Sequence, residues 1–142
     1  MFWVVEMSDG IQSKIRNTFQ VDEEEVLEQK LEEVSDWFGL DQDMIDLSPK
    51  ILELSKKWKY LTYVVAAKFA YYGDLREEEN VLHEEANDYF GWDRDDGETA
   101  KGHSRHISKY LTKTEGGSGR KIPPAKLDKA INHIKEELGE DE

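Results

Sequence analysis

The sequence predicts a mainly α-helical fold that contains a short β-hairpin near its C-terminal end. In several segments apolar residues recur at intervals of three and four, which places them on one face of a helix. A Gly-rich stretch, residues 116–119, lies between two short polar segments and is followed by Pro123-Pro124. Glycine and proline clusters of this kind are typical of a tight hairpin and of the restart of a helix.

The composition is that of a folded protein. The chain has 142 residues, of which 37% are hydrophobic and 11% aromatic, so we expect a domain with a substantial core. It has no cysteine, which excludes disulfide frameworks, thiolate zinc sites and cysteine nucleophiles. Lys68 interrupts the longest apolar stretch, and residues 1–6 lack the basic start of a signal peptide. We therefore expect a cytoplasmic protein with no membrane partner.

The first predicted helix spans residues 22–38. Asp22 and Glu25 form an acidic capping box, and Gly39 ends the helix. Its apolar stripe consists of Leu27, Leu31, Val34 and Phe38. Acidic residues cover most of the remaining surface, which we interpret as a solvated face rather than a site for a basic partner. We expect residues 1–21 to be poorly ordered and residues 22–48 to form this acidic helix and a linker.

The second predicted helix is the longest and most apolar, and should be central to the fold. Ser48 and Pro49 are typical of the cap and first position of a helix, and Gly73 ends it. Its apolar positions are Ile51, Leu54, Trp58, Leu61, Val65, Phe69 and Tyr72.

Two shorter helices follow. The first begins at about Asn80 and ends at Gly91, with Leu82, Ala86, Tyr89 and Phe90 on its apolar face. After the acidic loop 92–98, a helix is predicted from about Thr99 to Thr112. Its buried face consists of Ala100, Ser104, Ile107 and Leu111. Gly102 weakens this helix by about 1 kcal/mol relative to alanine.

The last predicted elements are a hairpin and a helix. Residues 113–115 and 120–122 flank the Gly-rich tip of the hairpin. Pro124 then begins a helix that extends to residue 138, with Leu127, Ala130, Ile131, Ile134 and Leu138 on one side. We expect one domain over residues 49–138 and an acidic tail over 139–142.

Charge is distributed very unevenly along the chain, whose formal net charge is −13. Residues 1–100 contain 10 basic and 25 acidic side chains, residues 101–135 contain 9 basic and 2 acidic ones, and residues 136–142 contain 5 acids. The positive segment coincides with the predicted helix 99–112, the hairpin and the start of the last helix. This asymmetry is the main indication of function in the sequence.

The order of these elements and three local matches resemble winged helix-turn-helix proteins, especially archaeal ones. "LTYVVAAKFAYYGDL" followed by "LHEEANDYFG" resembles their first two helices, "HSRHISKYL" their recognition helix and "TEGGSGRKI" their wing. The resemblance covers about residues 50–135. It implies a DNA-binding transcriptional regulator whose third helix enters the major groove of double-stranded DNA and whose wing contacts the backbone. It also implies a homodimer, with helix 22–38 or helix 124–138 as the contact.

The spacing of the basic residues agrees with this expectation. Lys101, Arg105 and Lys109 are four apart, so on a helix they lie within about 80° of one another, and the apolar positions centre about 120° away. The arginine side chain is shaped for bidentate hydrogen bonds to guanine, and lysine side chains are suited to contacts with phosphates. The DNA-contacting residues expected from the resemblance are Lys101, Ser104, Arg105, Ser108 and Lys109 on the helix and Lys113, Arg120 and Lys121 on the hairpin.

Two features leave an alternative open. The stretch "GWDRDDGE" is longer than the usual turn of about three or four residues before a recognition helix, and its acids repel phosphate. The acidic body also opposes approach to DNA at low salt. The alternative is a protein-interaction module whose basic face binds an acidic protein or the chain's own "EELGEDE" tail. A basic face that is merely solvated is a further interpretation.

The motifs of catalytic and metal sites are missing from the sequence. "HEEAN" places Asn87 where a zinc motif requires a second histidine, and His103 and His106 have no Glu-x-x-His partner. "DRDDG" has Ser104 where a calcium loop requires glutamate, and there is no nucleophile elbow or phosphate loop. We therefore expect a protein that is not an enzyme and that has no cofactor and no metal.

Overall fold

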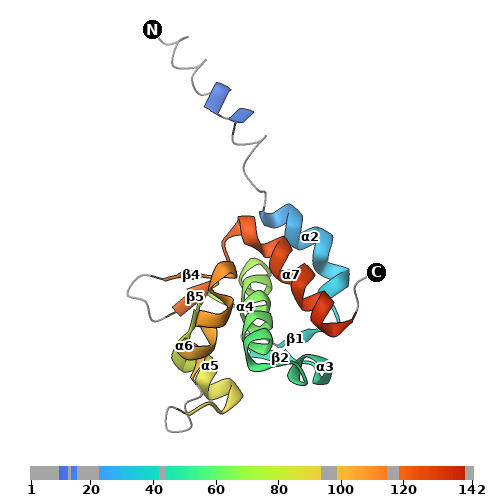
Figure 1. Ribbon diagram of the computed structural model, residues 1–142. Coiled ribbons are helices and arrows are strands. Elements are labelled where there is room, and N and C mark those ends of the chain that lie inside the picture. Colours follow the sequence, from blue (N-terminus) through green and yellow to red (C-terminus); the bar gives the residue numbers. More distant parts are fainter. Residues whose placement is uncertain are drawn as a thin grey trace.

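A computed structural model describes residues 10–12, 14–15, 23–41, 44–93, 99–114 and 119–139. The fold is mainly helical with two small antiparallel sheets (Figure 1). The elements in order are α2 (Glu23–Val34), β1 (Phe38–Asp41), β2 (Met44–Leu47), α3 (Pro49–Leu52), α4 (Lys56–Tyr72), β3 (Val81–Leu82), α5 (His83–Phe90), α6 (Ala100–Ser104), the 3₁₀ helix η2 (Arg105–Tyr110), β4 (Thr112–Lys113), β5 (Gly119–Lys121) and α7 (Pro124–Leu138). Residues 10–12 and 14–15 are also helical.

Helix α4 forms the centre of the core, as its apolar pattern predicts. Every residue from Tyr60 to Ala70 is buried, and α6, η2, α7, β2 and β5 all contact this helix. The predicted helix 49–72 is, however, divided in two. Glu53 closes α3, and Ser55 is extended at the start of α4. Serine favours such a cap position over a helix interior, whereas the apolar spacing continues through the break and gives no sign of it.

The N-terminal region differs from the prediction because its helix ends at Val34 instead of residue 38. Trp37 then enters the core with 0% exposure, and the expected linker contains the antiparallel hairpin β1–β2, in which Phe38 pairs with Leu47. The Leu47 N–H donates to Tyr89 Oη at 2.8 Å, which fastens this hairpin to α5. Leu31 is consequently 53% exposed, although the predicted stripe included it.

The second sheet has the strand order β3–β5–β4. The expected hairpin is present: Thr112 pairs with Lys121 and Lys113 with Arg120. Strand β3 was not predicted, because two residues are too short to show an alternating pattern, and α5 begins at His83 rather than at Asn80. Gly119 lies tightly against β3, where an added Cβ would be 3.0 Å from the Val81 carbonyl oxygen and 2.9 Å from Thr114 Oγ1.

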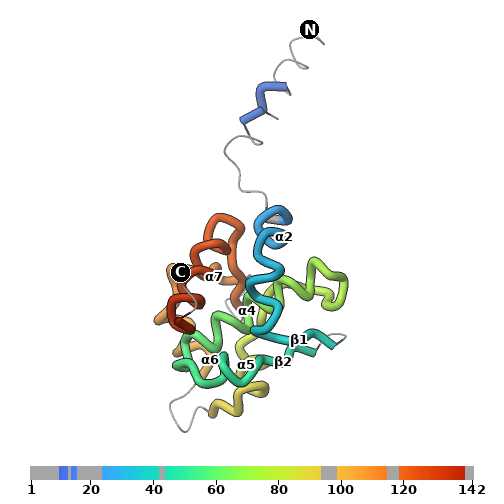
Figure 2. The backbone as a smooth tube through the Cα atoms, turned by 90° about the vertical axis from the view of Figure 1, so that its right-hand side faces the viewer, coloured from blue at the N-terminus to red at the C-terminus, as the bar shows by residue number. Residues whose placement is uncertain are grey.

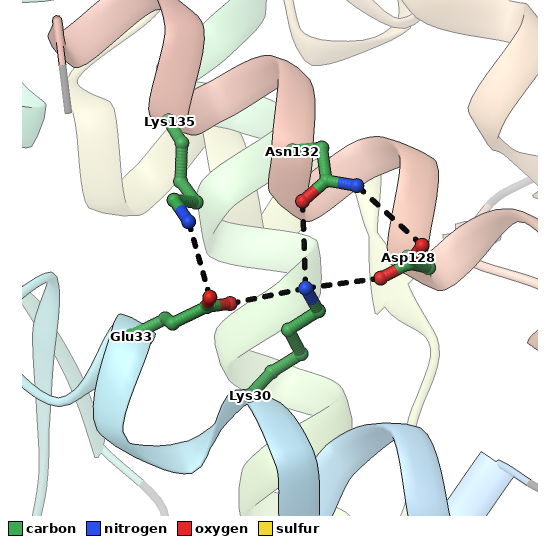
Figure 3. Close-up of polar contacts among 5 residues, drawn as sticks. All are labelled: Lys30, Glu33, Asp128, Asn132 and Lys135. Atoms are coloured by element: carbon green, nitrogen blue, oxygen red, sulfur yellow. Dashed lines mark hydrogen bonds and ion pairs between the residues drawn. The ribbon is translucent and has the colours of Figure 1, made fainter. Parts of the chain in front are cut away.

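Helix α7 has the predicted bounds and apolar face, with Leu127, Ala130, Ile131 and Ile134 buried. It runs beside α2, as Figures 1 and 2 show. Charged side chains join the two helices (Figure 3). Lys30 Nζ lies 3.1 Å from both Glu33 Oε2 and Asp128 Oδ1, and Lys135 Nζ lies 3.0 Å from Glu33 Oε1. We call this group of charges, Lys30, Glu33, Asp128 and Lys135, the α2–α7 clasp.

Candidate nucleic-acid interface

The predicted recognition helix is not one regular α-helix. Helix α6 ends at Ser104, η2 continues to Tyr110, and Ile107 departs from helical geometry with φ −123° and ψ 26°. A 3₁₀ helix has about three residues per turn, so positions three apart share a face. Ser104, Ile107 and Tyr110 are accordingly all buried, while Leu111 is only half-buried. The expected arrangement of cations at 100° per residue therefore does not extend past α6.

The start of α6 is fixed by two side chains. Thr99 Oγ1 accepts a hydrogen bond from the Gly102 N–H at 3.2 Å, which makes Thr99 a regular N-cap. The Ala100 N–H donates to Asn87 Oδ1 of α5 at 2.7 Å. Together these bonds hold α6 against α5 and orient its outer surface.

Five of the eight expected DNA-contacting residues are exposed: Lys101, Arg105, Ser108, Lys109 and Lys113. Lys121 is half-buried, and its Nζ lies 3.6 Å from Glu79 Oε1. We define the basic face as the four exposed cations of this group, Lys101, Arg105, Lys109 and Lys113.

The structure corrects two of the expected contacts. Ser104 is 1% exposed and its hydroxyl donates to the Lys101 carbonyl oxygen at 2.7 Å, so it faces the core. Arg120 is 6% exposed and its Nη1 donates to the Gly119 carbonyl oxygen at 2.8 Å. Arg120 is buried in β5, which contacts α4 and is the middle strand of its sheet, with β3 on the side that the sequence did not reveal.

Several basic residues outside the basic face are paired with carboxylates. Elsewhere Lys30, Lys50, Lys68, Arg76 and Lys135 each form an ion pair with a carboxylate at 2.6–3.1 Å. Within the described part of the chain no carboxylate forms an ion pair with Lys101, Arg105, Lys109 or Lys113. The described carboxylates therefore leave the positive charge of the basic face without an ion pair.

Sequence reasoning missed the cations that α4 contributes beside this face. Burial lowers the pKa of His103, and the positive charges of Lys56, His106 and Lys59 lower it further. Lys56 and Lys59 belong to the first turn of α4, so they lie close enough to α6 to act on His103 electrostatically. The run "KKWK" at 56–59 is the signal for these cations in the sequence, although its tryptophan belongs to the predicted core stripe.

Aromatic rings pack next to His103 of α6. The Trp92 ring lies 4.6 Å from the His103 ring and stacks on Phe90 at 4.5 Å. Lys59 Nζ lies 5.9 Å from the centre of the Phe90 ring. Asp93 follows Trp92 and is exposed, whereas Asp95, Asp96 and Glu98 of the acidic loop, like Glu115 and the hairpin tip, lie outside the described residues.

The described residues contain no group of three or more His, Cys, Asp or Glu side chains arranged to hold a metal ion. None of the helices in the described part of the chain combines the length and apolar character that crossing a membrane requires. Comparison of the chain with known protein families, curated proteins and solved structures found no match.

Proposed function

We propose that this protein is a DNA-binding transcriptional regulator that contacts double-stranded DNA through the basic face. The order of α4, α5, α6 with η2 and the β4–β5 ribbon agrees with the winged helix-turn-helix proteins that the sequence resembles. In that arrangement α6 and η2 lie at the major groove and the ribbon lies at the adjacent backbone.

The observation that carries this proposal is the unpaired charge of the basic face. A protein with 32 acidic residues has many carboxylates available, and yet these four cations stay exposed without a described carboxylate partner. Phosphates of DNA provide the missing negative charge, and their counterions are released on binding. Arg105 and Ser108 of η2 are both exposed, so both side chains are available to contact DNA.

We propose a homodimer as the DNA-binding form, because half-site recognition needs two copies. The apolar face of α7 is used in the core, whereas α2 leaves Leu31 53% exposed beside Tyr72, which is 41% exposed. These two residues line an apolar hollow together with Leu27 and Phe69. Leu31→Gln should shift the protein toward monomer in analytical ultracentrifugation, and an unchanged dimer would exclude α2 as the contact.

Fluorescence anisotropy with a genomic duplex at low salt tests DNA binding directly. For the intact protein the logarithm of the association constant should fall with the logarithm of salt concentration by about 0.9 per phosphate contacted. Arg105→Glu should weaken binding by about tenfold or more. Lys14→Glu is the matched control, since it changes the net charge equally at an exposed residue outside the basic face. Absence of binding by the intact protein would overturn the proposal.

One observation favours the alternative, in which the basic face binds an acidic protein. The departure from helical geometry at Ile107 distorts the element that a major groove would receive. In this case a pull-down should return an acidic protein, and the variant Lys101→Glu, Arg105→Glu, Lys109→Glu should lose it without any duplex binding by the intact chain. An increase in duplex affinity after deletion of residues 136–142 would instead indicate masking by the acidic tail.

A further inference from the structure

A second cationic site lies on the molecule, in a hollow between η2 and the first half of α7. Its lining residues are Lys109, Tyr110, Ala125, Lys126, Lys129 and His133. Three lysines and a histidine meet there, and no carboxylate is among the lining residues. We propose that this hollow binds a phosphate group. The proposal goes beyond the DNA-binding function and does not depend on it.

The lysines of the hollow come from two elements. Lys126 and Lys129 are three apart on α7 and therefore lie on neighbouring turns of one side, and Lys109 comes from η2. None of the three forms an ion pair with a carboxylate of the described residues.

The acidic residue nearest in sequence to these lysines forms its contacts on the other side of α7. Asp128 lies between Lys126 and Lys129 in the chain, but its Oδ1 is 3.1 Å from Lys30 Nζ and its Oδ2 accepts from Asn132 Nδ2 at 3.4 Å (Figure 3). Its negative charge therefore serves the α2–α7 clasp. Asp128 is thus directed toward α2, whereas Lys126 and Lys129 line the hollow.

The helix dipole adds to the positive potential of the hollow. Helix α7 has 15 residues and begins at Pro124, and Ala125 of its first turn lines the hollow. The N-terminal end of a helix carries a partial positive charge, which stabilises an anion placed against it.

The wall of the hollow contains a buried hydroxyl without a partner. Tyr110 is 2% exposed, and its Oη has no hydrogen-bond partner among the described residues. Its ring lies 5.3 Å from His133 and 6.3 Å from Trp58, so the side chain is held in place by packing. Leaving such a donor unpaired is costly, and phosphate oxygens are strong acceptors. Tyr110 lines the hollow, and its buried Oη becomes available to a phosphate oxygen only when the side chains around it shift.

Pyrophosphate and inorganic phosphate are suitable probes, titrated into the ¹⁵N-labelled full chain at constant ionic strength. Saturable shifts are expected at the amides of Lys109, Ala125 and Lys126. The variant Lys109→Gln, Lys126→Gln, Lys129→Gln should bind pyrophosphate at least about tenfold more weakly, because each charge-assisted contact contributes substantially. Tyr110→Phe, which keeps the ring, should weaken binding about severalfold.

The matched control is Lys101→Gln, Arg105→Gln, Lys113→Gln, which removes the same number of positive charges from exposed positions outside the hollow. It should leave pyrophosphate binding within about twofold of the intact protein. Shifts that do not saturate, or equal weakening in the two triple variants, would overturn the proposal.

The source of the phosphate follows from a second titration with duplex DNA. If the hollow variant also loses duplex affinity and pyrophosphate competes with the duplex, the site binds a nucleic-acid backbone. If duplex binding is unchanged, or absent in the intact protein, while pyrophosphate binding is lost in the hollow variant, the ligand is a free phosphorylated molecule. Both results support the hollow as a phosphate site, and the second shows that it stands when the DNA-binding proposal fails.

Discussion

Asn87 Oδ1 accepts a 2.7 Å hydrogen bond from the backbone N–H of Ala100, the first residue of α6. Asn87 belongs to α5, so a side chain of one helix caps the backbone of the next. The main-chain carbonyl oxygen of Asn87 also accepts a hydrogen bond, from the Trp92 N–H at 3.0 Å. The position of α6, and with it that of the basic face, therefore depends on this residue.

Asn87→Ala should lower the free energy of unfolding by about 1–2 kcal/mol, because the buried Ala100 N–H loses its acceptor. Urea denaturation measures this change. Asn87→Asp is the matched control, since a carboxylate oxygen can accept the same bond and also favours the N-terminal end of a helix. Equal losses in the two variants would contradict a capping role.

The α2–α7 clasp predicts a modest contribution to stability. Glu33→Gln should lower the free energy of unfolding by about 0.5–1 kcal/mol, because the pairs with Lys30 and Lys135 are partly exposed. Glu32→Gln removes the same charge from an exposed neighbour outside the clasp and should have almost no effect. Thermal unfolding of both variants at pH 7 makes the comparison.

The clasp also predicts how stability changes in acid. Burial acts to raise the pKa of Glu33, but hydrogen bonds and charge interactions with Lys135 and Lys30 outweigh it and lower the pKa below its ordinary value. The contribution of Glu33 is therefore present above about pH 4.3 and is lost as the pH falls through the lowered pKa. The difference in stability between the intact protein and Glu33→Gln should shrink over that range. A difference that stays constant would contradict the assignment.

Arg76 predicts a larger effect, because it is the centre of a half-buried network. Its guanidinium contacts both carboxylate oxygens of Glu85 at 2.6 Å, and Tyr63 Oη donates to Glu85 Oε2 at 2.8 Å. Arg76→Gln should cost about 2–3 kcal/mol in urea unfolding, because Glu85 is left without its counter-charge. Arg76→Lys keeps the charge but not the bidentate geometry, so its loss should be smaller. If Arg76→Lys lowers the free energy of unfolding as much as Arg76→Gln does, charge is not the main contribution of Arg76 to stability.

His103 predicts destabilisation below neutral pH. Its pKa is lowered by burial and by Lys56, His106 and Lys59, so the unfolded chain binds a proton more readily than the folded protein. Stability should be complete above about pH 6.5 and should fall as the pH drops toward the lowered pKa. His103→Gln should show a shallower loss between neutral and mildly acidic pH in thermal unfolding. Identical pH profiles would indicate that other groups cause any loss.

The helical part of the fold was largely predictable from sequence, and the β structure was only partly so. Helix α7 has a long apolar stripe, so its buried face could be read from spacing alone. Helix α4 is central as predicted, but it is buried on all sides from Tyr60 to Ala70, and Tyr72 of its predicted stripe is exposed. Strand β3 is too short to carry a pattern, and the hairpin after Trp37 was concealed because Phe38 continues the stripe of α2. In η2, Ile107 and Tyr110 are both buried, whereas the predicted stripe placed Leu111 rather than Tyr110 in the core.

The candidate site was predictable to a similar degree. The spacing of Lys101, Arg105 and Lys109 indicates outward-facing side chains, and all three are exposed. The prediction that Arg120 lies at the surface was wrong, because the packing of β5 against α4 and its pairing with β3, a strand 39 positions earlier in the chain, are tertiary features. Lys126 and Lys129 were not connected with Lys109, because residues of separate helices share a hollow only after the helices have packed.

Gly119 determines how the ribbon would respond to random mutation. Every missense change of a glycine codon introduces a side chain, and at this position a Cβ would meet the Val81 carbonyl oxygen at 3.0 Å. In a saturation library, substitutions at 119 should therefore be depleted under selection for folded protein. Lys113 is exposed on the neighbouring strand, so most replacements at 113 should be tolerated under selection for folded protein. They should be depleted only under selection for binding. These two positions of one mutational map would then distinguish a residue needed to form the ribbon from a residue needed for binding.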